Sequence, residues 1–272
     1  MSASLAVAFG GGGARGLAHI HAIEALDELG VRPVAIAGSS IGSIMGAAMA
    51  AGMSGQEIRE YALGLLSRRA EIASRIWRAR PESLREMVLG GFRIGQFNIE
   101  RILRTFLPEP IPETFEDLTI PLFVTGTDYF AHSLAVFESG DLRSALAASS
   151  AIPAVFRPVR RDDRLYIDGG IYDPVPFDIL MDKADVVLAI DVVGGPMPSD
   201  THPTTIDLMF GASQLMMQSI IAGHLQRCRP HLLLRPPVSR FRMLDFLKAS
   251  QVLNETAAIK DELKRGLEPL LN

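Results

Sequence analysis

The chain has 272 residues, a length that allows one large α/β domain as readily as two small ones. Hydrophobic residues make up 48% and charged residues 21%, which fits a globular protein with a substantial core and excludes an intrinsically disordered one. The net charge of −4 argues against a nucleic-acid-binding protein, because such proteins normally carry a strong basic excess.

Two strand–turn–helix units open the chain. Leu5–Phe9 is an apolar run that ends in four glycines, which indicates a strand and a tight turn. Apolar residues then recur at helical spacing over residues 14–29. Residues 34–37 form a second expected strand, and a small-residue helix follows over residues 41–51. Two such units in succession predict a parallel sheet covered by helices.

Further helices and strands alternate along the rest of the chain. Ser54 and Glu57 form a capping box for a helix over about residues 55–66, and Asp141 is placed to cap a helix over residues 142–148. The other expected helices cover about residues 98–106, 205–228 and 250–266. The other expected strands cover residues 121–127, 133–137, 165–168, 186–191 and 231–234. The sequence therefore predicts a three-layer α/β/α fold around a mostly parallel sheet.

The turn after the second strand, Gly38-Ser39-Ser40-Ile41-Gly42, has the G-x-S-x-G pattern of a nucleophile elbow. Small residues beside the serine let the backbone turn sharply, and the helix that follows favours negative charge at its N-terminus. The alternative is an ordinary turn serine or helix cap. The position between a strand and a helix favours Ser40 as a nucleophile, and we expect Ser39 to be structural.

The turn after the first strand, Gly10-Gly11-Gly12-Gly13-Ala14-Arg15-Gly16, exposes several backbone N–H groups at a helix N-terminus. Such a turn suits an oxyanion hole, and it also resembles a dinucleotide-binding turn. A dinucleotide site needs an acidic residue at the end of the second strand, and that strand ends here in glycine and serines. We therefore favour the oxyanion hole.

A serine nucleophile needs a base. A serine–histidine–acid triad has one remaining candidate, His202, in a proline-flanked loop. Asp168 is better placed, because it ends an apolar strand and is followed by Gly169 and Gly170, although it could also simply begin a turn. The other histidines after the elbow are less suitable as a base: His132, His224 and His231. The two histidines that follow the glycine turn, His19 and His21, are expected to be structural.

In this order the motifs resemble those of the bacterial patatin-like phospholipase family. The resemblance covers residues 5–177 and includes two further blocks, over residues 149–158 and 173–176. The family commonly has asparagine where Asp173 stands, which puts a local hydrogen bond in doubt. The resemblance implies a Ser–Asp dyad, with Ser40 as the nucleophile and Asp168 as the proton acceptor.

The resemblance also implies the supporting residues and the domain limits. Oxyanion and substrate-binding residues are expected in the glycine turn, at Gly11, Gly12, Gly13, Arg15 and Gly16. The glycines expected to support the motifs are Gly38, Gly42, Gly169 and Gly170. We expect a single patatin-like domain over residues 1–272, with a motif-bearing core at about 5–195 and a helical C-terminal portion at about 200–272.

The activity that follows from the resemblance is hydrolysis of lipid carboxyl esters, such as phospholipids or lysophospholipids, through an acyl-serine intermediate. No calcium loop or metal-ligand cluster is visible in the sequence, so we expect no metal and no cofactor. A noncatalytic regulator that binds a protein or an acyl ligand is the alternative from another class. An NAD-binding oxidoreductase is disfavoured by the missing acid.

Two features bear on contact with lipid. An arginine-rich stretch around Trp77 could lie on an anionic membrane, or it could be a solvated helix face: Arg68, Arg69, Arg75, Arg78, Arg80 and Arg85. Met209, Met216 and Met217 could line an acyl groove, but their helical spacing favours plain core.

No apolar run reaches the ~18 residues that a spanning helix needs, and no signal peptide is recognisable. The single cysteine, Cys228, excludes an intramolecular disulfide and fits a reducing compartment. We expect a cytoplasmic protein, with peripheral contact at the inner membrane face as an option. The oligomeric state is left open.

Overall fold

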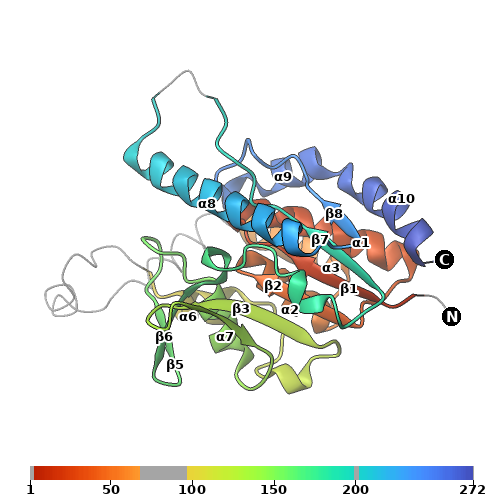
Figure 1. The fold of residues 1–272 in the computed structure, drawn as a ribbon, viewed down its shortest axis with the longest axis horizontal. Helices are drawn as coiled ribbons and strands as arrows, with labels where there is room; N and C mark the ends of the chain where they lie inside the picture. The colour runs from red at the N-terminus through yellow and green to blue at the C-terminus, as the bar shows by residue number, and fades with distance from the viewer. Residues whose placement is uncertain (1–2, 68–96, 199–201, 272) are drawn as a thin grey trace, which may run out of the picture.

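A computed structural model describes residues 3–67, 97–198 and 202–271 of the chain (Figure 1). The helices are α1 (His19–Leu29), α2 (Ile41–Ala50), α3 (Gly55–Ser67), α6 (Ile99–Phe106), α7 (Leu142–Ser149), α8 (Thr205–Arg227), α9 (Ala249–Thr256) and α10 (Ile259–Leu271). Short 3₁₀ helices are η1 (Gly13–Ala18), η2 (Phe115–Asp117), η3 (Gly169–Ile171), η4 (Asp178–Leu180) and η5 (Phe246–Lys248). The strands are β1 (Leu5–Phe9), β2 (Ala35–Ser39), β3 (Leu122–Asp128), β4 (Ser133–Phe137), β5 (Val159–Arg161), β6 (Arg164–Asp168), β7 (Val186–Ile190) and β8 (Leu232–Leu234).

The described strands form one mixed sheet in the order β5-β6-β3-β2-β1-β7-β8, and β4 pairs with β3 off this path. Five neighbouring strands of this order run parallel to one another: β3, β2, β1, β7 and β8. The strands β4 and β6 run antiparallel to β3, and β5 pairs antiparallel with β6. The prediction of a mostly parallel sheet is therefore confirmed.

Helices cover both faces of this sheet. Successive side chains of a strand point to opposite faces, so Val7 and Phe9 enter the larger core with residues of α1, α2, α7, α9 and α10. Ala8 enters a smaller core on the other face, where Ile221 of α8 packs. The helix α8 lies across that face (Figure 1). The predicted three-layer α/β/α arrangement is thus confirmed.

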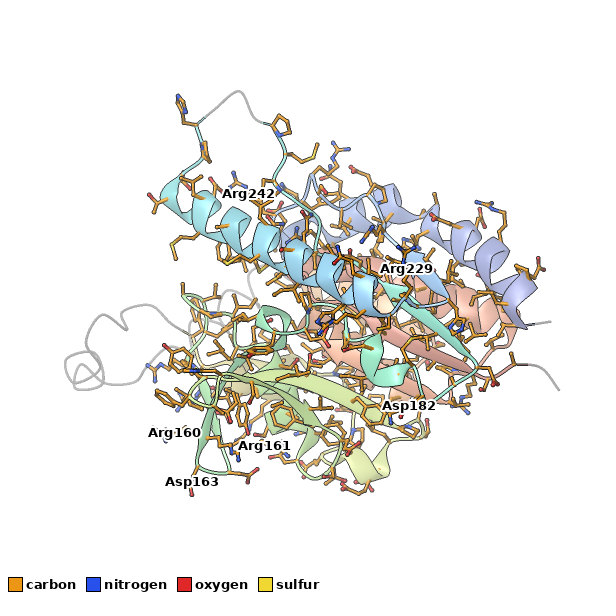
Figure 2. All side chains as sticks on the ribbon, viewed as in Figure 1. Arg160, Arg161, Asp163, Asp182, Arg229 and Arg242 are labelled. Carbon is orange, nitrogen blue, oxygen red and sulfur yellow. The ribbon has the colours of Figure 1, made fainter. Side chains whose placement is uncertain are left out.

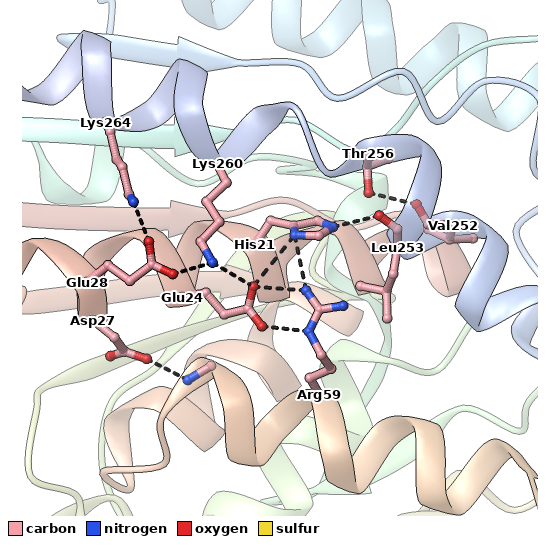
Figure 3. A network of polar contacts seen from close by, with 11 residues as sticks. His21, Glu24, Asp27, Glu28, Arg59, Val252, Leu253, Thr256, Lys260 and Lys264 are labelled. Carbon is pink, nitrogen blue, oxygen red and sulfur yellow. Dashed lines mark hydrogen bonds and ion pairs between the residues drawn. The ribbon is translucent and has the colours of Figure 1, made fainter.

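A network of polar contacts ties the C-terminal helices to α1 (Figure 3). Lys260 and Lys264 of α10 both form ion pairs with Glu28 of α1. His21 of α1 is buried, and its Nε2 lies 2.8 Å from the carbonyl oxygen of Leu253 in α9. Partly exposed ion pairs contribute at most about 1 kcal/mol each, so the apolar packing beneath this network contributes more to the attachment.

Two expected helices differ in detail from the structure. The helix predicted over residues 14–29 begins with the 3₁₀ segment η1, and the α-helix α1 starts only at His19. Gly13 has a left-handed φ of 60°, and the Ala14 N–H, which has no acceptor inside its own helix, donates to the Met243 carbonyl. The helix predicted over residues 250–266 is divided into α9 and α10. Buried side chains keep helical spacing across that break, at Val252 and Ile259 for example, so periodicity could not reveal it.

The strand β5 was not expected from the sequence. It forms a hairpin with β6, whose two turn residues, Asp162 and Asp163, have φ values of 48° and 60°. Two successive left-handed residues define the turn that matches the twist of a hairpin. Figure 2 shows Arg160, Arg161 and Asp163 projecting from this hairpin at the edge of the molecule.

Two predictions concern membranes. In the described parts of the chain no helix combines the length and the apolar character needed to cross a bilayer. The arginine-rich stretch over residues 68–85, with Trp77, lies outside the described residues.

Candidate active site

Ser40 lies at the sharp turn between β2 and α2. Its φ of 53° and ψ of −125° are unusual for a residue with a side chain and store strain of order 1–3 kcal/mol. Hydrogen bonds hold this conformation: the Ser40 N–H donates to Oγ of Ser149 at 2.8 Å, and the Ser40 carbonyl accepts from the N–H and the hydroxyl of Ser43. The backbone of the turn is therefore fixed from both sides.

The two glycines of the elbow are required by close contacts. A Cβ atom at Gly42 would lie 2.1 Å from the carbonyl oxygen of Phe9, and one at Gly38 would lie 2.5 Å from Cα of Ser43. Both distances are shorter than any real contact of a Cβ atom. The turn can therefore close only with glycine at these positions.

Asp168 is the partner of Ser40. The Ser40 hydroxyl donates to Oδ2 of Asp168 at 2.6 Å, and the Gly170 N–H donates to Oδ1 at 2.8 Å. Both side chains are buried, with Ser40 and Asp168 each 4% exposed. Burial raises the pKa of Asp168 from 3.8 to about 6, while the hydrogen bonds from Ser40 and Gly170 oppose the rise. The carboxylate is therefore a stronger base than a solvated aspartate.

Strand register brings these two residues together. In the parallel pair β2–β3, Ser39 lies opposite Thr125. In the antiparallel pair β3–β6, Asp168 lies opposite Gly126. Because β6 ends there, its last residue faces the elbow across β3. Gly169 then passes so close to β3 that a Cβ atom would lie 2.4 Å from the Thr125 carbonyl oxygen.

The glycine turn after β1 presents two unused backbone donors. The N–H groups of Gly11 and Ala14 donate to the carbonyl oxygens of Pro174 and Met243. Within the described residues, the N–H groups of Gly12 and Gly13 donate to no protein acceptor. Gly12 and Gly13 line the same cavity as Ser40. Two free backbone donors beside Ser40 have the arrangement that an oxyanion hole requires.

Arg15 supports this turn from inside the protein. Its side chain is 1% exposed, and Nε donates to the Gly12 carbonyl at 3.1 Å, which fixes the peptide that carries the Gly13 N–H. Burial lowers the pKa of Arg15 to about 10, while the charge of Asp191 opposes the shift. Gly16 does not line the cavity; a Cβ atom there would lie 2.4 Å from Cγ2 of Ile41, so its role is close packing against α2.

Ser40 and Asp168 open into a cavity of about 340 Å³. Most of its wall is apolar. The apolar residues come from α8, η3, the segments after α7 and β7, and the loop before η5: Ile152, Pro153, Ala154, Val155, Ile171, Val193, Met209, Phe210, Met217, Met243 and Leu244. The preference for core packing was wrong for Met209 and Met216, whose side chains are 56% and 61% exposed. Met217 is partly buried against the smaller core and also lines the cavity. Helical spacing was the same for a core stripe and for a wall of the cavity, so it could not separate them.

No histidine in the described part of the chain lines this cavity. His202 lines a different cavity, beside the start of α8. His19 and His231 make hydrogen bonds with backbone groups, as structural histidines do: Nε2 of His19 lies 2.8 Å from the Gly10 carbonyl oxygen, and Nδ1 of His231 accepts from the Val187 N–H.

Ser149 contacts the elbow, and this contact was not predicted from the sequence. It belongs to the block over residues 149–158, and its hydroxyl holds the Ser40 N–H. Ile152 and Pro153 of the same block line the cavity. Asp173, where the sequence departs from the family pattern, is buried, and neither carboxylate oxygen has a hydrogen-bond partner among the described residues.

Comparison with known proteins agrees with these motifs. The family model described as patatin-like phospholipase matches residues 7–181. An uncharacterised NTE family protein of Mycobacterium tuberculosis is 38% identical over 194 residues, which are 71% of this chain and 50% of that protein. The human patatin-like phospholipase domain-containing protein 6 is 34% identical over 198 residues, which are 70% of this chain and 13% of that protein.

Two solved structures are similar at lower levels. ExoU of Pseudomonas aeruginosa, in complex with SpcU, is 17% identical with a TM-score of 0.49, covering 99% of this chain and 52% of that one. VipD of Legionella pneumophila is 15% identical with a TM-score of 0.44, covering 94% of this chain and 67% of that one. At these TM-scores the likeness carries no argument about the present chain.

The elbow serine, the aspartate and the glycine turn lie in one cavity of an α/β/α domain, and the family model spans them all. The chain belongs to the patatin-like phospholipase family, a family of lipid acyl hydrolases. It spans about half the length of the mycobacterial relatives it matches.

Proposed function

We propose that this chain hydrolyses lipid carboxyl esters with a dyad of Ser40 and Asp168. The observation that carries the proposal is the 2.6 Å hydrogen bond from the Ser40 hydroxyl to Oδ2 of Asp168, inside a buried and largely apolar cavity. A nucleophile and a base within hydrogen-bond reach, the base itself oriented by a third group, are the signature of nucleophilic catalysis. The third group here is the Gly170 N–H.

In the first step Asp168 accepts the proton of Ser40 as the hydroxyl oxygen attacks the ester carbonyl. A general base is most effective when its pKa lies near the working pH. With a pKa of about 6, Asp168 is mostly ionised at pH 7 and still holds a proton well enough to pass it on. Its proton then goes to the departing alcohol, and the acyl group stays on Ser40.

The negative charge on the carbonyl oxygen is held by the N–H groups of Gly12 and Gly13. Losing one such donor typically costs about 3–4 kcal/mol of transition-state stabilisation. Arg15 acts as a positioning residue, because its bond to the Gly12 carbonyl fixes the orientation of the peptide that carries the Gly13 N–H. In the second step Asp168 removes a proton from water as the water oxygen attacks the acyl-Ser40 ester. Asp168 then returns this proton to the departing Ser40 oxygen, which frees the fatty acid and restores the dyad.

The cavity wall supports a lipid acyl chain as the group that is transferred. Met209, Phe210 and Met217 of α8 and Leu244 present apolar surface to the serine. Methionine side chains adapt to flexible apolar ligands. Phospholipids, lysophospholipids and related acyl esters all carry such an acyl chain. The apolar cavity wall does not discriminate between their headgroups.

Exposed apolar side chains on α8 support peripheral contact with a lipid surface. Leu208, Met209, Leu215 and Met216 are all more than half exposed, and Met209 lies at the cavity. Apolar residues at the entrance of a lipid-binding cavity can enter the headgroup region of a bilayer. We therefore propose that the enzyme takes its substrate from a membrane surface.

The experiment that tests the proposed function is labelling with a fluorophosphonate, followed by peptide mapping. The proposal expects one adduct, on Ser40. Ser39→Ala is the matched control, because Ser39 is the adjacent buried serine and makes no bond to Asp168. Labelling should survive in Ser39→Ala and vanish in Ser40→Ala. A folded wild-type protein without an adduct on Ser40 would favour a noncatalytic ligand-binding role.

A further inference from the structure

A second polar cluster lies outside the catalytic cavity. It consists of Asp173, which follows η3, Asp178, which begins η4, and His224 in the last turn of α8. One potential ligand atom from each residue lies within 4.8 Å of the others. Nδ1 of His224 is 3.7 Å from Oδ1 of Asp173 and 3.9 Å from Oδ2 of Asp178. The three side chains therefore converge on one point.

Asp173 is the unusual member of this cluster. Its side chain is fully buried, and neither oxygen has a hydrogen-bond partner among the described residues. Among the described residues, no lysine or arginine forms an ion pair with Asp173. A buried carboxyl group whose oxygens have no partner is costly, and a bound cation would satisfy them.

We propose that Asp173, Asp178 and His224 bind a divalent cation of the zinc class. Two carboxylate oxygens and one imidazole nitrogen are a donor set that zinc accepts, with water in the fourth position. Ligands on a tetrahedral zinc ion stand ~3.3–3.4 Å apart, because the bonds are ~2.0–2.1 Å long. The separations of 3.7 and 3.9 Å from His224 are a few tenths of an ångström longer than this, and all three ligand atoms lie within 4.8 Å of one another.

The donor set also selects among cations. Calcium takes six to eight oxygen ligands, and magnesium keeps oxygen ligands and several waters. An imidazole nitrogen instead suits zinc and its transition-metal neighbours.

The position of the cluster suggests a structural role for the cation. It would join the C-terminal end of α8 to the segment that follows Asp168. The same helix supplies Phe210 and Met217 to the cavity wall, and the Asp173 N–H donates to the carbonyl of Gly169, next to the catalytic aspartate. None of the three cluster residues lines the catalytic cavity. The cation would hold the wall in place and take no part in hydrolysis.

This site could not be predicted from sequence, because its ligands have no recognisable spacing. Asp178 and His224 are 46 positions apart and belong to different elements. From the sequence we expected no metal, and the proposed site departs from that expectation, although the proposed steps of hydrolysis use none.

The test uses the full chain, stripped of metal with a chelator and then titrated with zinc chloride. Zinc bound per chain is measured by elemental analysis after dialysis, and affinity by calorimetry. We expect about one zinc ion per chain and a rise in the thermal midpoint on loading. Asp173→Asn keeps the shape of the side chain, and His224→Gln removes the imidazole; each should weaken zinc binding at least tenfold.

His202→Gln is the matched control, because His202 is an exposed histidine outside the cluster. It should bind zinc like the wild type. Circular dichroism and the thermal midpoint of each metal-free variant show that the domain has folded. Asp178→Asn, at a partly exposed position, repeats the test if Asp173→Asn does not fold. Zinc binding that is absent from the wild type, or unchanged in folded His224→Gln, would overturn the proposal.

A loaded cobalt form gives an independent readout. Cobalt in a tetrahedral site absorbs visible light far more strongly than octahedral aqueous cobalt. The cobalt-loaded wild type should show such bands, and His224→Gln should lose them. Bands of equal strength in His224→Gln would place the metal elsewhere.

Discussion

The Ser40 hydroxyl donates directly to Oδ2 of Asp168 at 2.6 Å, and no other side chain stands between them. The other carboxylate oxygen accepts the Gly170 N–H, so the aspartate is oriented by backbone. A triad uses an acid to orient a histidine that then acts as base. In the proposed dyad the aspartate itself acts as the base, and a glycine N–H orients it.

The pH dependence of hydrolysis should report the ionisation of Asp168. The carboxylate must be ionised to accept the Ser40 proton, and burial raises its pKa to about 6. We expect kcat/KM for a soluble ester to fall about tenfold for each pH unit below 6. The measurement is a pH profile of kcat/KM with a substrate that does not itself titrate. A profile that stays flat down to pH 4.5 would show that the base is a less buried group.

Asp168→Asn should make the protein more stable at pH 8. Because the folded pKa of about 6 lies above the ordinary 3.8, the native state holds the proton more tightly than the unfolded state does. Wild-type stability therefore falls as the pH rises from about 4 through 6, by about 3 kcal/mol for this group. An uncharged asparagine avoids this loss of stability. The net gain is smaller by the amount that the hydrogen bond from Ser40 to Asp168 contributes to the wild type.

Urea unfolding of the wild type and Asp168→Asn at pH 4 and at pH 8 measures this difference. The variant should gain stability relative to the wild type only at the higher pH. Equal differences at both pH values would mean that the Asp168 carboxylate is not destabilised by burial.

Ser149→Ala should reduce kcat, because the Ser149 hydroxyl accepts the hydrogen bond of the Ser40 N–H. Its loss leaves a buried N–H unsatisfied, at a cost of about 1–3 kcal/mol, and frees the strained elbow. We expect kcat to fall roughly tenfold with little change in KM. Ser150→Ala is the matched control, since the adjacent hydroxyl is also buried but has no hydrogen-bond partner in the described structure. Similar losses in both variants would remove the special role of Ser149.

Met216→Gln should distinguish lipid surfaces from soluble substrates. Met216 is exposed, does not line the cavity, and lies two helical turns from Met209 on the same face of α8. We expect hydrolysis of phospholipid vesicles to fall roughly tenfold, since about 1.5 kcal/mol of apolar burial is lost, while a soluble short-chain ester is hydrolysed as before. Val34→Thr is the control. Val34 is exposed and precedes the first residue of β2, whereas the elbow with Ser40 follows the last residue of that strand. An equal loss on both substrates would contradict surface binding.

The elements that carry the site were largely predictable from local patterns. The strand β1, the elbow and the caps at Ser54 and Asp141 each follow from a few adjacent residues, and the structure has them. Apolar alternation and turn residues act over short distances in the chain, so they are readable from sequence.

The contacts between distant segments were not predictable in this way. Ser149 reaches Ser40 across 109 positions, and Asp168 faces the elbow only because β6 runs antiparallel to β3 and stops opposite Gly126. Strand order and register decide such contacts. The exposure of Met216 likewise depends on α8 covering a face of the sheet only in part.

The central claim is tested most directly by the turnover of Asp168→Asn. The asparagine has nearly the shape of the aspartate but cannot accept the Ser40 proton. We predict that kcat for ester hydrolysis falls on the order of 10²–10⁴-fold, while circular dichroism and the thermal midpoint show a folded protein. A folded Asp168→Asn enzyme that turns over within a few-fold of the wild type would show that Asp168 is not the base.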